Sequence, residues 1–405
     1  MIPASPEDEA ITKEVGMMSK TIPRPLIKWP GGKASEIGQF MHLIPDHDRY
    51  IEPFAGGAAL YFYLNPPSAI LNDTSQYLMD FYGLVKAQDK EFHRILNQQC
   101  RSFAALQKLC LEKYASLRLL FSLYERALED GAAADVRELE IHRALVREII
   151  GNEAVDESLI PDREEFERTM CDSVEDKMIR TVRIHQKKPL TEKDLQANLI
   201  TGFTSGYYLY QRDLFNGIAA GKVLTSPQYK AANFYFVREY CYGSMFRYNR
   251  KGEFNIPYGG ISYNRKDLTA KVEQMFSPGI ARLLGRTQLY CMDFEELLRG
   301  LDLTDRDFIF LDPPYDTDFS DYEGNEFGKE DQIRLEKLLE TIGASFLLVI
   351  KDTPFIRSLY EGKFRILEFE NRYLYNVRSR NDRKANHLII TNIPEGQVPW
   401  LRENV

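Results

Sequence analysis

The sequence of 405 residues has few cysteines, no long apolar run and no excess of positive charge. Its five cysteines form no CxxC pair and have no histidine at zinc-ligand spacing, which predicts reduced thiols in packing positions and no metal site. No apolar run approaches the roughly 18 residues that span a bilayer, so we expect no membrane segment. The acidic, polar N-terminus lacks the features of a secretory signal, which predicts an intracellular protein.

The net charge of −8 argues, as an average, against binding to nucleic acid, because proteins that bind phosphate backbones usually carry excess Lys and Arg. The charge is unevenly distributed, however. Between Glu125 and Ile160 the sequence has ten acidic residues and four arginines, whereas between Val237 and Lys266 it has six basic residues, two acidic residues and seven aromatics. This composition predicts a basic, aromatic surface in the second region.

Seven short β-rich runs predict strands, with helical patterns between several of them, such as Tyr77–Lys86 and Lys329–Ile342. This alternation favours a parallel α/β sheet. It stops between Lys90 and Gly285, where apolar residues at three- and four-residue intervals predict a helical insertion over about 92–200. The predicted strands are Tyr50–Glu52, Ala69–Leu71, Gln288–Cys291, Asp307–Leu311, Phe346–Ile350, Phe364–Phe369 and His387–Thr391.

The most informative motif is Asp312-Pro313-Pro314-Tyr315, which directly follows an apolar predicted strand. Ligands of open α/β sheets bind at the carboxyl ends of strands. A carboxylate at Asp312 and the carbonyl of Pro313 can each accept one N–H of a planar amine such as the exocyclic nitrogen of adenine, which frees its lone pair for attack. Tyr315 offers a ring on which a base can stack. The alternative is a proline-rich turn that only ends the strand.

Two further motifs precede and follow the first predicted strand. The strand runs into the small-residue turn Glu52–Ala59, which would let the backbone approach a nucleotide-like ligand, and Asp73 follows the next strand, where a carboxylate commonly holds a ribose diol. Asp73 is also a candidate helix N-cap. Earlier, in Leu26–Lys33, two glycines bring Trp29 and Lys33 together, so that Lys33 can meet a carboxylate and Trp29 a cation.

The ordered motifs KWPGGK, EPFAGG, LND, RYNRKGEFNIPYGG and LDPPY resemble those of the Dam-type DNA adenine-N6 methyltransferases, the D12 class, from about Leu26 to Asn392. The resemblance implies an α/β, Rossmann-like, seven-stranded S-adenosylmethionine-dependent methyltransferase fold with an inserted, largely helical target-recognition region. We therefore predict a tail at 1–20, a catalytic domain in two parts at 21–90 and 286–395, a helical insertion at 91–200, a target-recognition region at 201–285 and a tail at 396–405.

The resemblance also implies roles for individual residues. Asp312, Pro313 and Tyr315 would be catalytic, with Tyr315 stacked on a flipped adenine. The residues implied to bind S-adenosylmethionine are Trp29, Lys33, Glu52, Phe54, Gly56, Asp73, Asp293, Phe294 and Asp312. Two departures from the family pattern are Gly57-Ala58 after Gly56, in place of a Gly-x-Gly core, and Thr74-Ser75 after Asp73.

The stretch Arg238–Asn249 resembles the target-reading hairpin of the family, with Gly243 where the best-known members carry Asn, which leaves the recognition sequence open. Arginine can read guanine through paired hydrogen bonds. We expect phosphate contacts from Arg238, Arg250, Lys251, Arg265 and Lys266, with bland solvent exposure as the alternative. The residues implied to bind DNA are Lys28, Tyr242, Arg247, Asn249, Pro257, Arg378 and Arg380.

The sequence thus predicts methyl transfer from S-adenosylmethionine to N6 of a flipped-out adenine in double-stranded DNA, without a metal or a membrane. The alternatives are an RNA adenine or cytosine-N4 methyltransferase, or a DNA- or cofactor-binding subunit of a larger assembly. The insertion near 92–200 would enlarge the DNA footprint, bind a protein partner or brace the recognition region. We expect a cytoplasmic, nucleoid-associated protein of bacterial, plasmid or phage origin, in a setting such as restriction-modification, phage biology, defence or housekeeping methylation.

Overall fold

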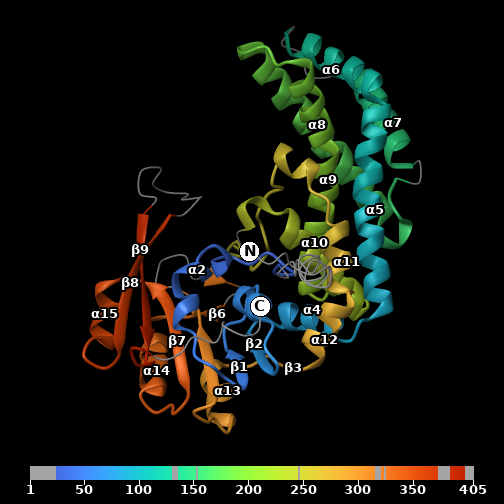
Figure 1. Cartoon of the computed structure of the whole chain (residues 1–405). Coiled ribbons are helices and arrows are strands. Elements are labelled where there is room, and N and C mark those ends of the chain that lie inside the picture. The colour runs from blue at the N-terminus through green and yellow to red at the C-terminus, as the bar shows by residue number, and fades with distance from the viewer. Residues whose placement is uncertain are drawn as a thin grey trace, which may run out of the picture.

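The structure of the protein, a computed structural model, describes residues 24–129, 136–151, 154–244, 247–314, 321–322, 325–372 and 384–396. These residues form an α/β body from which a long helical arm projects (Figure 1). The tail predicted at 1–20 and residues 397–405 of the other tail lie outside the described residues.

A sheet of seven strands in the order β3-β2-β1-β4-β7-β9-β8 forms the centre of the body. All seven predicted strands are present, and the predicted fold class, a Rossmann-like α/β fold, is confirmed. Their sequences are short and rich in β-branched and aromatic residues, as strands buried on both faces require. The strands are β1 Arg49–Glu52, β2 Ala69–Asn72, β3 Thr287–Tyr290, β4 Asp307–Leu311, β7 Ser345–Lys351, β8 Arg365–Arg372 and β9 Lys384–Thr391.

The direction of the last strand corrects the prediction of a parallel sheet. Strands β1, β2, β3, β4 and β7 pair in parallel, but β9 pairs antiparallel with both β7 and β8. The physical reason is that only 11 residues separate β8 from β9, whereas a parallel crossover needs a dozen or more.

Alternate side chains of each strand enter two separate cores, one on each face of the sheet. Along β4, Phe308 and Phe310 join the first core, whereas Ile309 and Leu311 join the second. Helices of the first core include α2 Ile37–Phe40, α3 Ala59–Leu64, α4 Gln76–Lys86 and α12 Pro278–Gly285, with the short turns η1 Lys33–Ser35 and η2 Met41–Leu43 beside α2. The second core is covered by α13 Phe294–Gly300, α14 Lys329–Leu339 and α15 Pro354–Tyr360.

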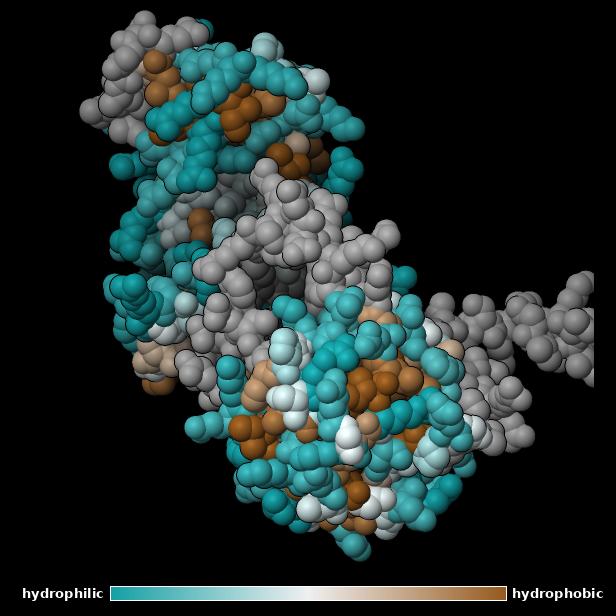
Figure 2. Space-filling view, turned by 90° about the vertical axis from the view of Figure 1, so that its left-hand side faces the viewer, coloured by the Kyte–Doolittle hydropathy of each residue, from teal (hydrophilic) through white to brown (hydrophobic). Residues whose placement is uncertain are grey.

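The helical insertion forms the arm, and its apolar seam belongs to the same first core. On the face shown in Figure 2, hydrophilic side chains cover most of the arm, with apolar ones gathered near its far end. The boundary predicted at residue 200/201 falls inside α9, because one continuous amphipathic helix joins the arm to the next region. The arm contains α5 Lys90–Glu112, α6 Tyr114–Glu129, α7 Val136–Gly151, η3 Glu157–Leu159, α8 Arg163–Lys187 and α9 Glu192–Ala219.

Residues 201–285, the predicted target-recognition region, connect the arm back to the sheet. Its hairpin is held by antiparallel bridges from Cys241 to Tyr258 and from Tyr248 to Phe254. The hairpin predicted from residue 238 therefore begins later, since α10 continues through Tyr240. The region contains α10 Pro227–Tyr240, η4 Tyr242–Ser244, η5 Ile261–Arg265 and α11 Thr269–Met275, and a separate small ladder pairs β5 Asp321–Tyr322 with β6 Asn325–Glu326.

Candidate active site

A pocket of about 500 Å³ opens at the carboxyl ends of β1 and β4. The chain leaves β1 toward β2 on one side, while β4 continues the sheet on the other, so this is the point where the strand order reverses. Ligands of open α/β sheets bind at such a point. The pocket is lined by residues of the Trp29–Lys33 loop, the Glu52–Leu60 turn, the Asp73–Ser75 segment, Asp293, Phe294, Phe310, Asp312–Pro314, Phe327 and Asp331.

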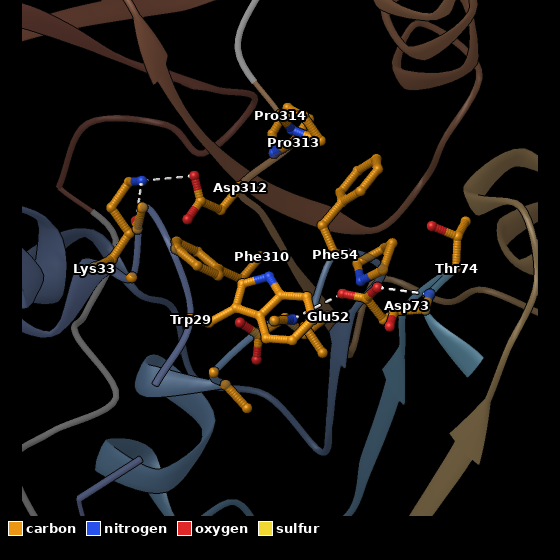
Figure 3. A pocket seen from close by; sticks show the side chains of 18 of the residues that line it. Trp29, Lys33, Glu52, Phe54, Asp73, Thr74, Phe310, Asp312, Pro313 and Pro314 are labelled. Carbon is orange, nitrogen blue, oxygen red and sulfur yellow. Dashed lines mark hydrogen bonds and ion pairs between the residues drawn. The ribbon is translucent and has the colours of Figure 1, made fainter. Parts of the chain in front are cut away.

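Asp312 and Lys33 form an ion pair at the carboxyl end of β4. Lys33 Nζ lies 2.7 Å from Asp312 Oδ1 and also donates to the carbonyl of Gly31 at 2.9 Å (Figure 3). The lysine side chain is buried, whereas 19% of the Asp312 side chain remains exposed. Burial raises the pKa of Asp312, and the charge of Lys33 opposes that rise. The expectation that Lys33 meets a carboxylate is confirmed, and the ion pair favours the ionised form of Asp312.

A buried contact between His387 and Glu36 lies behind this ion pair. His387 Nδ1, on β9, lies 3.0 Å from Glu36 Oε2, and both side chains are buried. Glu36 follows Lys33 by three residues in the chain. Glu36 closes the η1 turn through a backbone bond from its N–H to the Lys33 carbonyl at 2.8 Å. Because these contacts join η1 to the sheet, they hold the Lys33 segment in place beside Asp312. This pair could not be predicted from the sequence, because its two residues are 351 positions apart.

The turn after β1 is fixed by Asp73 at the end of β2. Asp73 Oδ2 accepts the N–H of Gly56 at 3.0 Å, and Oδ1 accepts the N–H of Ser75 at 2.9 Å. Burial raises the pKa of Asp73, and these two backbone donors oppose the rise. The N-cap of α4 is Ser75, whose hydroxyl accepts from Leu78 N–H, so Asp73 is not itself the cap. Its carboxylate instead shapes the pocket wall.

Gly56 lies against the indole of Trp29. Gly56 has a φ of +47°, and a Cβ placed there would lie 2.5 Å from Trp29 Cδ1. This position requires glycine for two reasons: its backbone is left-handed, and the Trp29 ring leaves no space for a Cβ. Trp29 was expected to face a cation, and the structure shows that this cation is Arg238, whose guanidinium carbon lies 4.6 Å from the centre of the indole.

The far end of the pocket is aromatic. The ring centres of Phe54, Phe294 and Phe327 lie 5.4 to 5.7 Å apart. These contacts connect the turn after β1 with α13 and with the segment just before α14. Asp293 is the N-cap of α13, where it accepts from Glu295 N–H, and it pairs with Arg334 at 2.6 Å. Phe327 was not predicted, although the rule that ligands bind after the carboxyl ends of strands would have included the segment between β4 and α14.

The pocket walls carry an excess of negative charge. Its lining has five carboxylates and one lysine. Glu52 is fully enclosed and bonded to the Tyr50 hydroxyl at 3.0 Å; burial raises its pKa well above the usual value, and the charges of Asp312 and Asp73 raise it further. A bound cation would relieve this repulsion, so the pocket suits a positively charged ligand with an apolar, planar part. The carboxylates are Glu52, Asp73, Asp293, Asp312 and Asp331.

The residues predicted to bind DNA gather partly on the hairpin. Tyr242, 44% exposed, donates its N–H to the carbonyl of Pro257 at 2.9 Å, and Arg247 is exposed. Asn249 instead closes the hairpin turn, since its side chain accepts from Lys251 N–H at 2.8 Å. The structure therefore brings Tyr242 and Pro257 together. Tyr315, Arg378 and Arg380 lie outside the described residues.

Two of the five cations expected to contact phosphate have other partners. Arg238 is buried against Trp29, and Lys266 pairs with the buried carboxylate of Glu239 at 2.5 Å. The prediction for Arg238 was wrong, because Trp29, a partner distant in sequence, covers its side chain. Lys266 keeps 20% of its side chain exposed, so its phosphate contact stays a prediction. Arg250, Lys251 and Arg265 are exposed. Lys28 is half-buried, with Nζ 4.9 Å from the centre of the Tyr263 ring.

The rest of the described chain adds neither a membrane-spanning helix nor a metal cluster. No helix among the described residues is both long and apolar enough to cross a bilayer. Within the same part of the chain, no group of three or more His, Cys, Asp or Glu side chains is arranged to hold a metal ion.

Comparison with known proteins places these features in a family. A family model described as D12 class N6 adenine-specific DNA methyltransferase matches residues 29–159 and 183–374, well over half of the chain. The unmatched gap falls mostly in α8 of the arm. The fold and the pocket at its reversal point define a Rossmann-like methyltransferase. The chain belongs to the D12 class of N6 adenine-specific DNA methyltransferases.

Individual relatives cover different shares of the chain. Type II methyltransferase M.MjaIII of Methanocaldococcus jannaschii is 25% identical over 84% of this chain and 88% of its own length. Type II methyltransferase M.CviBI of Paramecium bursaria Chlorella virus NC1A is 35% identical over 40% of this chain and 60% of its own length. DNA adenine methylase of Haemophilus influenzae is 29% identical over 44% of this chain and 60% of its own length.

Proposed function

We propose that this protein transfers the methyl group of S-adenosylmethionine to N6 of an adenine flipped out of double-stranded DNA. The observation that carries the proposal is the position of Asp312. Its carboxylate stands at the carboxyl end of β4, is held by Lys33 and borders a pocket large enough for a nucleoside cofactor. DNA adenine methylation is the activity of the family to which the chain belongs.

The pocket residues fit S-adenosylmethionine. The aromatic end formed by Phe54, Phe294 and Phe327 suits an adenine ring, and the carboxylate of Asp73, whose oxygens keep further lone pairs, suits a ribose diol. The acidic lining suits a sulfonium and an ammonium group. Trp29 and Lys33 would lie beside the methionine part. When bound, the cofactor supplies an electrophilic methyl group.

Asp312 and Pro313 would act on the target adenine. Lys33 holds Oδ1 of Asp312, which leaves Oδ2 to accept one N–H of the adenine amine, while the carbonyl of Pro313 accepts the other. These bonds favour a pyramidal nitrogen with its lone pair free to attack. N6 would form a bond to the methyl group that the cofactor supplies, and the bond of that methyl group to sulfur would break. The proton released from N6 passes to Oδ2 of Asp312 or to solvent, so no strong base is needed.

The hairpin would provide contact with the DNA duplex. N6 of a paired adenine is not accessible for in-line attack, so the base must leave the helical stack. Tyr242 and Arg247 present an exposed ring and an exposed cation on one hairpin, which suits support of a distorted base step and reading of a base edge. Tyr315 would stack on the flipped base, and Arg378 and Arg380 remain predicted DNA contacts.

Transfer of a labelled methyl group, followed by nucleoside analysis, tests the proposal. Plasmid DNA incubated with the protein and labelled S-adenosylmethionine should yield N6-methyladenine, and mapping of methylated positions should identify the recognition site. Asp312→Asn should abolish transfer while the protein still binds the cofactor, because the amide keeps the size of the side chain but loses one acceptor. Asp305→Asn, an exposed carboxylate in the turn before β4, is the matched control and should leave transfer unchanged.

The same experiment separates the alternatives. Label in RNA adenine or in N4 of cytosine would replace the proposed substrate. An Asp312→Asn protein with full transfer would contradict the mechanism, and a wild-type protein that binds both ligands without transfer would be a binding subunit. Restriction-modification, association with the nucleoid and a protein partner for the arm stay predictions, which the methylation map and a pull-down with the intact chain would address.

A further inference from the structure

The indole of Trp29 lies between the cofactor pocket and the recognition region. On the pocket side, Gly56 approaches so closely that any Cβ there would overlap Trp29 Cδ1. On the other side, the guanidinium carbon of Arg238 lies 4.6 Å from the ring centre, and the Phe234 ring packs edge-on at 6.5 Å. Arg238 and Phe234 belong to α10, the helix that leads into the hairpin. The position of the indole is therefore set by both parts of the protein.

Two neighbouring residues at the end of α10 also hold the backbone of Lys28. Arg238 Nη2 donates to the Lys28 carbonyl at 3.2 Å, and Glu239 Oε1 accepts the Lys28 N–H at 2.8 Å. Arg238 and Glu239 are both fully buried. Since one residue binds the carbonyl and the next binds the N–H, the Lys28-Trp29 segment cannot move independently of the last turn of α10.

Glu239 extends this connection to the segment that follows the hairpin. Its carboxylate pairs with Lys266 at 2.5 Å and with Lys271 at 2.6 Å. One residue further along, the Tyr240 carbonyl accepts from Gly259 N–H at 3.0 Å. Both sides of the hairpin are thus attached to the same turn of α10 that fixes Lys28 and Trp29. A ligand that moves the hairpin must therefore also act on the wall of the cofactor pocket.

We propose that Arg238 and Glu239 are positioning residues that couple DNA binding at the hairpin to cofactor binding at Trp29. This inference rests on the proposed function. The first ligand to bind favours one position of the shared turn of α10, so the second ligand meets a site that is already in its binding-competent position. By linkage, DNA must raise the affinity for the cofactor by the same factor by which the cofactor raises the affinity for DNA.

Fluorescence of Trp29 gives a direct readout of this coupling. The chain has two tryptophans, Trp29 and Trp400, so a Trp400→Phe protein reports Trp29 alone. In this background, sinefungin, an unreactive cofactor analogue, is titrated with and without a duplex that contains the mapped recognition site. We expect the duplex to tighten sinefungin binding by about 10-fold, within the roughly 5- to 150-fold range of typical couplings.

Substitution of Arg238 should remove most of this effect. In Arg238→Met the tightening should fall below about 2-fold, outside the usual range of couplings, and the emission of Trp29 should shift because its cation is lost. Arg238→Lys restores a cation and should give an intermediate factor, which also serves if the methionine variant fails to fold. Arg282→Met, an exposed arginine on α12, is the matched control and should behave as the parent protein.

The outcomes separate this inference from the proposed function. If the parent protein binds sinefungin and duplex without mutual tightening, or if both Arg238 variants retain the full factor, the coupling is contradicted while methyl transfer stands. If the parent protein neither binds sinefungin nor transfers a methyl group, the proposed function itself fails.

Discussion

Substitution of Gly56 by alanine should damage the cofactor pocket specifically. The new Cβ would lie 2.5 Å from Trp29 Cδ1, 3.0 Å from Nε1 and 3.2 Å from Cγ. Carbon atoms in contact normally lie about 3.5 to 4.0 Å apart, so the indole or the turn must move by about 1 Å. Trp29 is a rigid side chain held on its other side by Arg238. The turn is equally constrained, because Gly56 N–H is bonded to Asp73.

Two separate effects contribute to the expected loss of stability. A left-handed backbone costs a residue with a Cβ about 1–2 kcal/mol relative to glycine. Overpacking in a closely packed site adds about 1–3 kcal/mol. Gly221, between α9 and α10, has a φ of +68° with no atom within 4 Å of an added Cβ, so Gly221→Ala should show the first effect alone. The difference between the two variants therefore isolates the contact with Trp29.

Urea denaturation and calorimetric titration with S-adenosylmethionine measure both consequences. Gly56→Ala should unfold with a free energy lower than that of Gly221→Ala by about 1–3 kcal/mol. It should also bind the cofactor at least about 10-fold more weakly, since a loss of 1.4 kcal/mol corresponds to that factor. Equal stability of the two variants, together with unchanged cofactor affinity in Gly56→Ala, would refute the role assigned to the contact between Gly56 and Trp29.

Three further substitutions test the charges of the protein. Lys33→Met removes the charge that lowers the pKa of the buried Asp312, so this pKa should rise further and the acidic limb of the kcat–pH profile should move to higher pH. Burial raises the pKa of Glu239, but Lys271 and Lys266 outweigh it and hold the pKa at about 2, below the ordinary 4.5. The stability that Glu239 contributes is present above the ordinary value and lost as pH falls toward the folded value, so urea unfolding of wild type and Glu239→Gln should converge in that window. Arg247→Ala should weaken discrimination at one position of the recognition site by about 1–3 kcal/mol in a binding assay with single-base substitutions, whereas Arg282→Ala should not.

The strands and the pocket motifs were accessible from sequence because their signals are local. Short apolar runs ended by turn residues identified all seven strands; Asp312 and Asp73 follow strands directly, and Gly56 lies four residues after one. The direction of β9 was also accessible in principle, since no helical pattern separates it from β8 and a parallel connection needs a crossover. The prediction failed because the rule for βαβ units was extended beyond the part of the chain that has helices.

The burial of cations was not accessible, because it depends on partners far along the chain. Arg238 looks like a surface arginine in a basic, aromatic segment, yet it contacts Trp29, more than 200 positions earlier. Lys266 pairs with the buried carboxylate of Glu239, and Glu36 pairs with His387 across almost the whole chain. Composition gives the number of charges in a segment, but only tertiary packing decides which of them reach solvent.

The total charge of −8 therefore says little about either ligand, because each ligand meets only the charges nearby. Electrostatic effects are screened over about 8 Å at physiological ionic strength, less than the size of either binding region. Inside the pocket, five carboxyl groups face one lysine, so a bound cation would reduce the repulsion between the carboxylates. On the hairpin, Arg247, Arg250 and Lys251 are exposed, with no acidic residue among positions 247–252. A single chain can thus present a negative site to a cationic cofactor and a positive one to DNA, with a buried turn of α10 between them.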